Sequence, residues 1–543
     1  MKKYILVLLS LLSGILLWLS WYPNGIPFLS FIALVPLLII SDEILKYKLS
    51  FWQGMLYSFP AFFVWNAATT WWIWNSTPPG AVAALFLNSL FMSMIFGLWQ
   101  LFKKRKPSSL AVPLAFIAFW CSWEFLHLHW DISWPWLNLG NLFAPVTGVI
   151  QWYEYTGTFG GTIWILGANF LFYYFIRYIR ENRKKGLIYA GSFAAWLIIP
   201  ITISLIIYKS YDFKRENPID TVVVQQNTDP WHEQYRMSNT DHVIRILKLA
   251  TPYIDQNTGL VICPESAIPH SVSGKALLDK TYPPEDDYYF GFVLLDTLFH
   301  RFPHLNMITG LSTYNWFDNK IRPTAREVAP GKFLEMYNTA ACINIDGVSE
   351  LYYKSKLVPG VELMPYPALF GFLEKLIIDL GGPSGSLGID TMQRAFRTTL
   401  NGGTVKVGSP VCYESIYGEL FGRFIKDGAQ VMSVITNDAW WNETPGHRQH
   451  FIYSRLRAVE TRRTILRAAN TGISAVIDER GDVIHQTKYG ERTVIKTTVY
   501  PNDQITFYVK HGDYLARFAL GISVLMLLYL IVLWITNRRN RIR

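Results

Sequence analysis

The chain alternates long apolar stretches with one long polar segment. Seven apolar runs lie near residues 4–22, 27–40, 51–72, 80–102, 108–128, 156–176 and 187–208, and an eighth lies at 514–536. A helix needs about 20 mostly apolar residues to cross a bilayer, so the pattern predicts about eight transmembrane helices. The run at 27–40 is the weakest, because it is short and contains Pro36. We therefore expect a transmembrane helical domain at 1–212, a polar domain at 213–511, and a C-terminal helix with a basic tail at 512–543.

The basic residues predict the orientation of these helices. With the N-terminus inside, the cytoplasmic segments are the N-terminus, 41–50, 102–107, 177–186 and the tail, and together they carry 17 Lys and Arg. The outside loops at 23–26, 73–79 and 129–155 carry none. Short cytoplasmic loops are enriched in Lys and Arg, so we expect both termini inside and the polar domain outside. A cleavable signal peptide is the alternative for the first run, but no small-x-small site follows it.

The polar domain alternates short β-rich runs with longer helical ones. Strands are expected at 221–226, 260–263, 307–312, 338–345, 405–412, 430–436, 473–478 and 494–500. Helices are expected near 238–255, 415–427 and 447–463, and loops or lids at 315–332 and 360–400. Such alternation is typical of α/β layering, in which functional residues usually follow the strand ends.

The composition indicates a membrane protein and not a nucleic-acid-binding one. The net charge is +10, but the basic residues stand in short clusters beside apolar runs, and the mean hydropathy is +0.18. The 21 Trp, 30 Tyr and 34 Phe suit interfacial aromatic belts. Three of the four cysteines lie in the polar domain, so at least one of them is free even in an oxidising compartment. The pair His127 and His129 lacks a third ligand, so no metal site is predicted.

Three reactive side chains stand out in the polar domain: Glu265 in Cys-Pro-Glu-Ser, Lys354 in Tyr-Lys-Ser-Lys and Cys412 in Val-Cys-Tyr-Glu. A thiolate is a strong nucleophile, a carboxylate can take its proton, and an ammonium can stabilise a tetrahedral oxyanion. Taken singly, each has an ordinary explanation as a core thiol, a cap or a surface lysine, and Lys356 competes with Lys354 for the role. Together they suit acyl transfer through a thioester, and the flanking spans suggest a lipid donor or acceptor.

The sequence motifs around these residues resemble those of a known family. The order Pro264-Glu265-Ser266-Ala267, then Lys354 through Glu362, then Cys412-Tyr413-Glu414 resembles the carbon–nitrogen hydrolase (nitrilase) superfamily. The membrane topology and four further sequence motifs make the whole chain similar to the apolipoprotein N-acyltransferase family. These motifs are Asn437-Asp438-Ala439-Trp440, Gln449-His450, Arg455-x-Arg457-Ala458-x-Glu460 and Asn470-Thr471-Gly472-Ile473-Ser474-Ala475. The resemblance implies an αββα sandwich on the periplasmic face of the bacterial inner membrane.

The resemblance also implies a reaction. Cys412 would take a fatty acyl chain from a phospholipid, typically phosphatidylethanolamine, and pass it to the α-amine of the N-terminal diacylglyceryl-cysteine of an apolipoprotein. Glu265 would be the general base and Lys354 would stabilise the oxyanion. Supporting positions that match the family are Glu362, Tyr413, Glu414 and, less closely, Trp231. No cofactor or metal is implied. One departure is Pro359-Gly360-Val361-Glu362, where Pro-Phe-Gly-Glu is common in the family.

The sequence leaves several alternatives open. The same three residues would serve a membrane-tethered amidase or nitrilase that hydrolyses a small amide, although a tether needs only one span. A transporter with an external receptor domain is another candidate, but no span carries the paired charges that mark an ion path. Asn437-Asp438 could be only a turn, and Trp440 and Trp441 either pack the core or form a lipid-gating loop. We expect a group of arginines to form a solvated helix face or to bind phospholipid head groups: Arg455, Arg457, Arg462 and Arg463.

Overall fold

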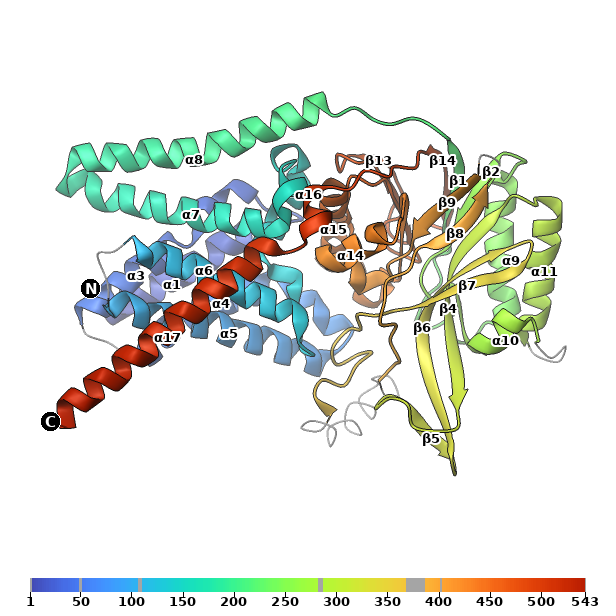
Figure 1. The fold of residues 1–543 in the computed structure, drawn as a ribbon, viewed down its shortest axis with the longest axis horizontal. Helices are drawn as coiled ribbons and strands as arrows, with labels where there is room; N and C mark the ends of the chain where they lie inside the picture. Colours follow the sequence, from blue (N-terminus) through green and yellow to red (C-terminus); the bar gives the residue numbers. More distant parts are fainter. Residues whose placement is uncertain are drawn as a thin grey trace. The chain divides into compact units, whose positions relative to one another are not determined.

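The structure of the chain is a computed structural model that describes residues 2–47, 51–105, 110–281, 287–367, 386–400 and 403–542. It divides into two compact units. A helical unit comprises Met1–Trp74, Pro78–Ser210 and His511–Arg543, and an α/β unit comprises Asn75–Thr77 and Tyr211–Lys510. Figure 1 shows the helices and strands of both units.

The helical unit contains the predicted apolar runs. Its helices are α1 (Lys3–Leu19), α2 (Ser30–Ala33), α3 (Val35–Lys46), α4 (Phe51–Thr70), α5 (Pro78–Arg105), α6 (Ala111–His129), α7 (Tyr153–Glu181), α8 (Arg183–Ser210) and α17 (Tyr514–Ile542). Short 3₁₀ helices join some of them, namely η1 (Pro27–Leu29), η2 (Trp71–Asn75), η3 (Pro135–Leu137) and η4 (Leu139–Val149). The run at 27–40 is broken into η1, α2 and α3, as its proline and short length suggested.

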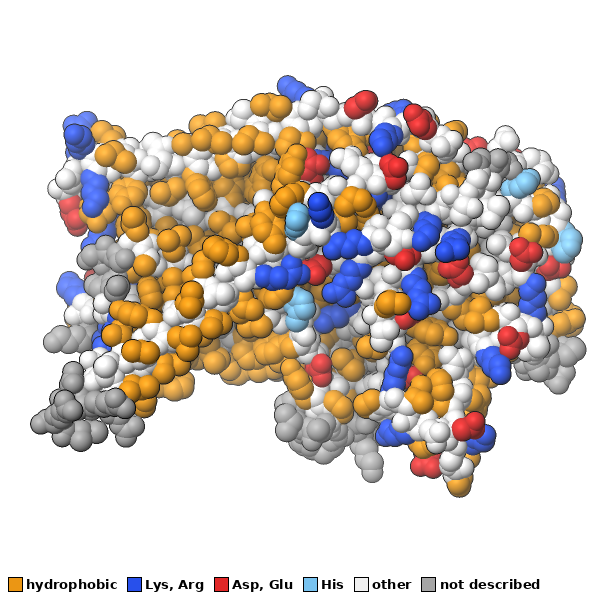
Figure 2. All heavy atoms as spheres, viewed as in Figure 1, with side chains coloured by type: hydrophobic (Ala, Val, Ile, Leu, Met, Phe, Trp, Pro, Cys, Tyr) orange, Lys and Arg blue, Asp and Glu red, His pale blue; other side chains and the backbone are white. Residues whose placement is uncertain are grey.

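Within the described residues, six helical segments are long and apolar enough to cross a membrane, the broken one at Pro27–Lys46 among them. Helix α1 has only 17 residues, and α4 has 20 residues but is not apolar enough in composition, so neither is among the six. The apolar segments of α8 and α17 are only 6% and 11% buried within the structure. Figure 2 shows hydrophobic side chains over both helices, and exposed apolar surface of this extent is typical of contact with lipid.

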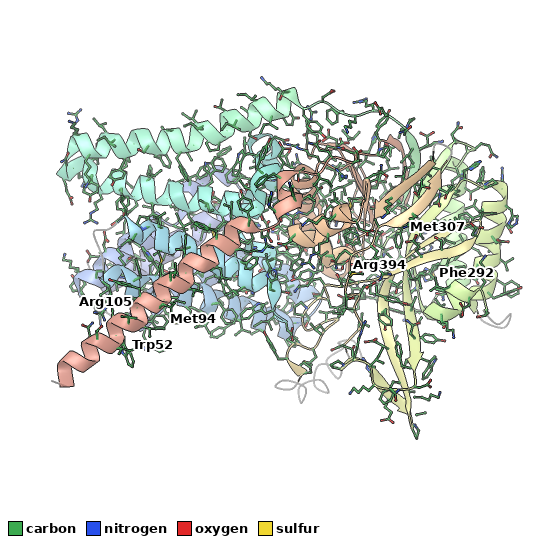
Figure 3. All side chains as sticks on the ribbon, viewed as in Figure 1. Trp52, Met94, Arg105, Phe292, Met307 and Arg394 are labelled. Carbon is green, nitrogen blue, oxygen red and sulfur yellow. The ribbon has the colours of Figure 1, made fainter. Side chains whose placement is uncertain are left out.

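The basic segments of the helical unit meet at one end of it. Asp42 of α3 forms ion pairs with Lys103 of α5 at 2.7 Å and with Arg177 of α7 at 3.6 Å. The N-terminus, the turn between α7 and α8, Arg105 and the C-terminus lie at this same end (Figures 1 and 3). Three segments predicted to be cytoplasmic are therefore neighbours in space, while α8 and α17 join the α/β unit at their opposite ends.

The α/β unit holds two sheets. The first is eight-stranded over the described residues, in the order β14 (Thr493–Val499), β1 (Ile219–Gln225), β2 (Thr258–Ile262), β4 (Asn306–Phe317), β6 (Lys332–Asn344) and β5 (Arg326–Ala329), with β3 (Ile268–Ser273) on β4 and β7 (Gly347–Tyr353) on β6. The second is six-stranded, in the order β13 (Val483–Gln486), β12 (Ala475–Ile477), β11 (Ile465–Ala469), β10 (Val431–Thr436), β9 (Gly403–Gly408) and β8 (Phe396–Leu400).

Helices accompany both sheets. They are α9 (Asn239–Ala250), α10 (Gly274–Asp279), α11 (Asp287–Arg301), α14 (Gly418–Lys426), α15 (Pro445–Thr461) and α16 (Phe507–His511), with the 3₁₀ helices η5 (Thr251–Tyr253), η7 (Cys412–Ile416) and η8 (Asp438–Trp441). A capping box of Ser238 and Asp241 starts α9. One core joins α9 and α11 to the first sheet through Val243, Phe292 and Met307 (Figure 3).

Parallel strands at the centre of each sheet set the position of the site. The strands β1, β2 and β4 are parallel in the first sheet, and β9, β10 and β11 are parallel in the second. β2, β10 and β11 are buried along their whole length, which suits the largely apolar sequences of β2 and β10. The α/β layering predicted from the sequence is confirmed in this part of the chain.

Some predicted elements were wrong. The segment 315–332, expected to be a loop, continues β4 to Phe317 and contains β5. The strand expected to run to Cys412 ends at Gly408, because Pro410 has no N–H for a ladder bond. The expected lid at 360–400 contains β8 at its end, and its residues 368–385 lie outside the described residues.

Candidate active site

Glu265 lies just beyond the carboxyl end of β2. Gly310 of β4 allows the turn that carries Glu265 to approach closely, since a Cβ at Gly310 would lie 2.6 Å from the Glu265 Cα. The buried carboxylate accepts hydrogen bonds at both oxygens: Oε1 from Asn338 Nδ2 at 2.7 Å, and Oε2 from the Asn437 backbone N–H at 2.8 Å. The two sheets thus both contribute to the orientation of this side chain.

Lys354 follows β7 and is only 1% exposed. Its Nζ lies 3.3 Å from Glu265 Oε1 and 2.8 Å from Glu362 Oε1. Burial would lower the pKa of this lysine, but the carboxylates of Glu362 and Glu265 outweigh burial and hold its pKa well above the ordinary value. The side chain is therefore a fixed positive charge between two carboxylates.

Glu362 completes this cluster. Its Oε1 accepts from Lys354 Nζ and from Asn338 Nδ2, the latter at 3.0 Å, and its Oε2 accepts from the Val358 N–H at 2.9 Å. The spacing of eight residues from Lys354 therefore returns the carboxylate to the lysine, despite the unusual Gly360-Val361 before it.

Cys412 begins η7 and adopts a left-handed backbone with φ of +49°. Non-glycine residues rarely adopt this conformation, and it occurs preferentially at functional sites. Burial and the nearby Glu265 carboxylate raise the pKa of the thiol, while the Lys354 ammonium acts to lower it. The resting residue is a protonated thiol, so a base must remove its proton before it can attack.

Glu414 anchors the two segments that carry Lys354 and Cys412. Its fully buried Oε1 accepts from the Ser355 N–H at 2.7 Å, the Ser355 hydroxyl at 2.6 Å and the Tyr352 hydroxyl at 2.6 Å. Its Oε2 accepts from the Val411 N–H at 2.7 Å. One carboxylate therefore connects the residue after Lys354 with the residue before Cys412.

The other predicted residues lie further from this cluster. Tyr413 is buried, and its ring packs edge-on against Tyr417 at 5.2 Å. Trp231 is 52% exposed, packs edge-on against Trp440 at 4.9 Å, and lines a cavity of about 590 Å³ in the α/β unit. The competing Lys356 places its Nζ over the Tyr417 ring at 5.1 Å.

Two contributions to the cluster were missed by the sequence analysis. Asn338 of β6 donates to both Glu265 and Glu362, and its backbone carbonyl accepts from the Lys354 N–H at 2.8 Å. The only signal for Asn338 in the sequence was its place at the start of the predicted strand 338–345. Asn437 is more than part of a turn, because its N–H holds Glu265.

The prediction for the arginine group was wrong. Arg457, Arg462 and Arg463 are each at most 1% exposed, so they neither form a solvated face nor reach lipid head groups. Arg457 pairs with Glu460 at 2.9 Å, and the other two donate to backbone carbonyls. The half-buried Arg455 donates to the Gly481 carbonyl at 2.7 Å. The guanidinium groups of these arginines therefore bind a carboxylate and backbone carbonyls within the α/β unit.

The arrangement has the parts needed for covalent acyl transfer. Glu265 is a carboxylate beside a protonated thiol, and Lys354 is a cation close enough to influence that thiol. A nucleophile, a base and a positive charge at one point can form and resolve a tetrahedral intermediate. Groups of three or more metal-ligating side chains are absent from the described part of the chain.

Known proteins match both units. Residues 222–505 match the carbon-nitrogen hydrolase domain, and residues 13–171 match the apolipoprotein N-acyltransferase N-terminal domain. An apolipoprotein N-acyltransferase of Chlorobaculum tepidum is 28% identical over 532 residues, which cover 95% of this chain and 94% of that protein. Another from Aquifex aeolicus is 28% identical over 501 residues, covering 90% of this chain and 97% of that protein. The crystal structure of an amidase from Nesterenkonia is 17% identical with a TM-score of 0.36, covering 57% of this chain and 98% of that one.

The match over 222–505 spans more than half of the chain, which therefore belongs to the carbon-nitrogen hydrolase family. Within that class, the match of the N-terminal unit and the nearly full-length relatives place the chain among the apolipoprotein N-acyltransferases.

Proposed function

We propose that the chain is an enzyme that transfers a fatty acyl group to the N-terminus of apolipoproteins. The single observation that carries this proposal is the buried cluster of Glu265, Lys354 and Glu362 beside Cys412, in a chain whose helical unit matches the N-terminal domain of this enzyme family. A hydrolase of small amides would have the same cluster but no use for a large helical unit.

In the proposed first half-reaction, Glu265 takes the thiol proton of Cys412 and the sulfur attacks an ester carbonyl of a phospholipid. A carbon–sulfur bond forms, and the tetrahedral oxyanion is stabilised by Lys354. The carbon–oxygen bond to glycerol then breaks, and Glu265 returns the proton to the glycerol oxygen. The products are a thioester on Cys412 and a lysophospholipid.

In the second half-reaction, the neutral α-amine of a diacylglyceryl-cysteine attacks the thioester carbonyl. A carbon–nitrogen bond forms, the carbon–sulfur bond breaks, and Glu265 transfers the amine proton to the departing thiolate. Cys412 returns to its thiol form and the acceptor carries an amide. The fixed charge of Lys354 serves both half-reactions, because each passes through an oxyanion at the same carbon.

We further propose that the α/β unit is an αββα sandwich on the outer face of the inner membrane, held by about eight spans, with both termini in the cytoplasm. The distribution of Lys and Arg supports this orientation, and so does the meeting of Asp42, Lys103 and Arg177 at one end of the helical unit. A phospholipid donor, with phosphatidylethanolamine as the expected head group, suits an enzyme embedded in lipid.

The test is reconstitution of the full-length protein with a phospholipid and a synthetic diacylated lipopeptide. We expect lipopeptide acylation that depends on the phospholipid and is absent from Cys412→Ala. Cys342→Ala is the matched control, since Cys342 is also a buried free thiol but lies in the core of β6. Release of ammonia from small amides without lipopeptide acylation would favour the amidase instead.

A further inference from the structure

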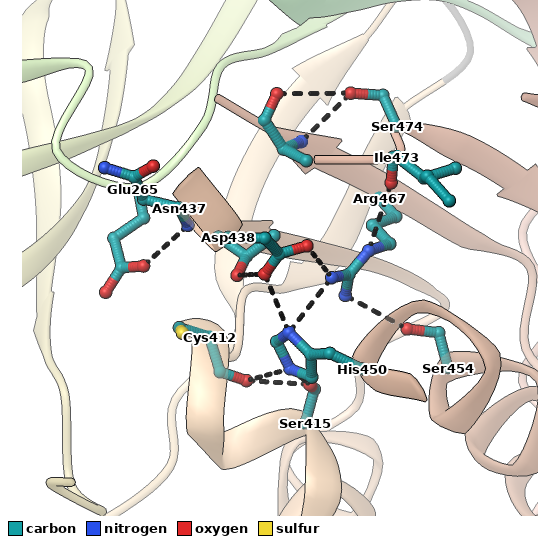
Figure 4. Close-up of polar contacts among 12 residues, drawn as sticks. Glu265, Cys412, Ser415, Asn437, Asp438, His450, Ser454, Arg467, Ile473 and Ser474 are labelled. Atoms are coloured by element: carbon teal, nitrogen blue, oxygen red, sulfur yellow. Dashed lines mark hydrogen bonds and ion pairs between the residues drawn. The ribbon is translucent and has the colours of Figure 1, made fainter. Parts of the chain in front are cut away.

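A second polar cluster lies behind Cys412, on the side of its carbonyl group (Figure 4). It comprises Asp438 at the start of η8, His450 of α15 and Arg467 of β11, and all three side chains are fully buried. Arg467 Nη2 donates to Asp438 Oδ2 at 2.7 Å, and His450 Nδ1 lies 2.9 Å from Asp438 Oδ1. The reaction described above does not use these residues.

This cluster reaches the nucleophile directly. His450 Nε2 lies 3.2 Å from the Cys412 carbonyl oxygen and 3.0 Å from the Ser415 hydroxyl. The Ser415 hydroxyl in turn donates to the Cys412 carbonyl at 2.7 Å. The backbone of Cys412, which has the unfavourable φ of +49°, is therefore held by the Ser415 hydroxyl, and His450 of α15 contacts that hydroxyl.

The protonation of the cluster follows from its charges. Burial would raise the pKa of Asp438, but Arg467 and His450 outweigh burial and lower it, so the group is a carboxylate. A carboxylate can only accept, so it directs the His450 proton to Nδ1 and leaves Nε2 as an acceptor beside the Ser415 hydroxyl. Burial and Arg467 hold the pKa of His450 below its ordinary value, so the ring is uncharged at neutral pH.

Stability alone is a poor explanation for such a cluster. A buried ion pair gains little over well-packed apolar residues of the same volume, because both charges lose their hydration. Strained backbone at a functional site persists only where its surroundings hold it in place. Gly472 supports the arrangement, since a Cβ there would lie 2.5 Å from Asp438 Oδ2.

We propose that Asp438, His450 and Arg467 are positioning residues that act through the Ser415 hydroxyl, which donates to the Cys412 carbonyl, to hold the nucleophile in its left-handed conformation, with its thiol directed at Glu265. The thiol and the cluster then lie on opposite sides of the Cys412 backbone, as Figure 4 shows. One test of this inference, the rate of thioester formation, rests on the proposed acyl transfer. The other test, alkylation of the Cys412 thiol, does not depend on that function.

The cluster also places a charge near the thiol. The titratable groups around Cys412 come from five elements and are Glu265 after β2, Lys354 after β7, Glu414 in η7, Asp438 in η8 and His450 in α15. Among them Asp438, like Glu265, raises the pKa of the thiol, while Lys354 lowers it. Removal of the Asp438 charge should therefore make the thiolate form at lower pH.

The first test measures formation of the thioester on the full-length protein by intact mass. His450→Leu and Ser415→Ala should form it roughly 10- to 100-fold more slowly, the loss expected for a misplaced reacting group. His450→Gln, whose amide can still reach the Ser415 hydroxyl, should lose less. His447→Leu is the matched control, because His447 is equally buried on α15 but packs against Tyr489, and it should form the thioester at the wild-type rate.

The second test needs no lipid and so separates this inference from the proposed function. The alkylation rate of Cys412 by iodoacetamide is followed against pH by peptide mass spectrometry. Asp438→Asn should move the midpoint to lower pH, and His447→Leu should leave it unchanged. The inference is overturned if Ser415→Ala and folded His450→Leu protein form the thioester at the wild-type rate, or if folded Asp438→Asn protein keeps the wild-type midpoint. Should Asp438→Asn not fold, Ser415→Ala, which removes a single oxygen, decides the matter.

Discussion

Replacing Lys354 by methionine should abolish acyl transfer through two separate effects. The first is loss of the charge that stabilises the oxyanion, and one such donor is typically worth on the order of 10²–10³ in rate, or about 2.7–4 kcal/mol. The second arises because Lys354 Nζ lies 3.3 Å from Glu265 and 2.8 Å from Glu362. Without the cation, the buried Glu265 carboxylate and the partly buried Glu362 carboxylate share the Asn338 amide and repel each other.

The structural cost of the same change can be separated from the chemical one. Removing one partner of a buried ion pair costs about 3–5 kcal/mol, so the melting temperature of Lys354→Met should fall at pH 8. Adding Glu362→Gln to the Lys354→Met variant removes one of the two carboxylate charges. The double variant should recover much of the melting temperature without recovering activity.

The assay is thioester formation by intact mass, with the melting temperature measured on the same samples. Lys356→Met is the matched control, since Lys356 is two residues away and places its Nζ over the Tyr417 ring at 5.1 Å. Activity of Lys354→Met within a few-fold of wild type, at unchanged stability, would refute this reasoning. Loss of activity in Lys356→Met alone would show that the wrong lysine was chosen.

Three further predictions follow from other parts of the molecule. Glu414→Gln should lower both the melting temperature and the rate of thioester formation, because an amide nitrogen would face donors now bound by a carboxylate; wild-type values for both would contradict the anchoring role. The pKa of Asp438 is lowered in the folded state, so its contribution to stability is present above about pH 4 and is lost as the pH falls below that value. The melting temperature of Asp438→Asn should therefore decline less than that of the wild type between pH 5 and pH 3. Single cysteines placed at exposed positions within 213–511 should react with an impermeant thiol reagent in intact spheroplasts, whereas one within 178–186 should react only after lysis, and the reverse pattern would overturn the proposed topology.

The helical unit was largely predictable from the sequence because its signal is local. Each span needs about 20 consecutive apolar residues, and composition within that window decides the outcome. The predicted runs at 80–102 and 187–208 became α5 and α8 with small changes at their ends. The strands of the α/β unit were also recognised where they are buried on both faces, as in β2 and β10.

The details of the site were harder to predict because they depend on contacts between distant segments. Asn338 is 73 residues from Glu265 in the chain, and only the pairing of β6 with β4 brings the two together. Nothing in the local pattern distinguishes this Asn from a solvated one. Arg457 and Arg463 look like surface residues in sequence, yet the fold surrounds them with carbonyls and a carboxylate.

The most direct test of the central claim is the mass of the protein after incubation with a phospholipid of defined acyl chains and no acceptor. The account predicts an increase equal to one acyl group, located on Cys412, which disappears when a diacylated lipopeptide is added and never forms on Cys412→Ala. The same acyl adduct on the Ala variant, or an adduct that the lipopeptide does not remove, would contradict transfer through a thioester at Cys412.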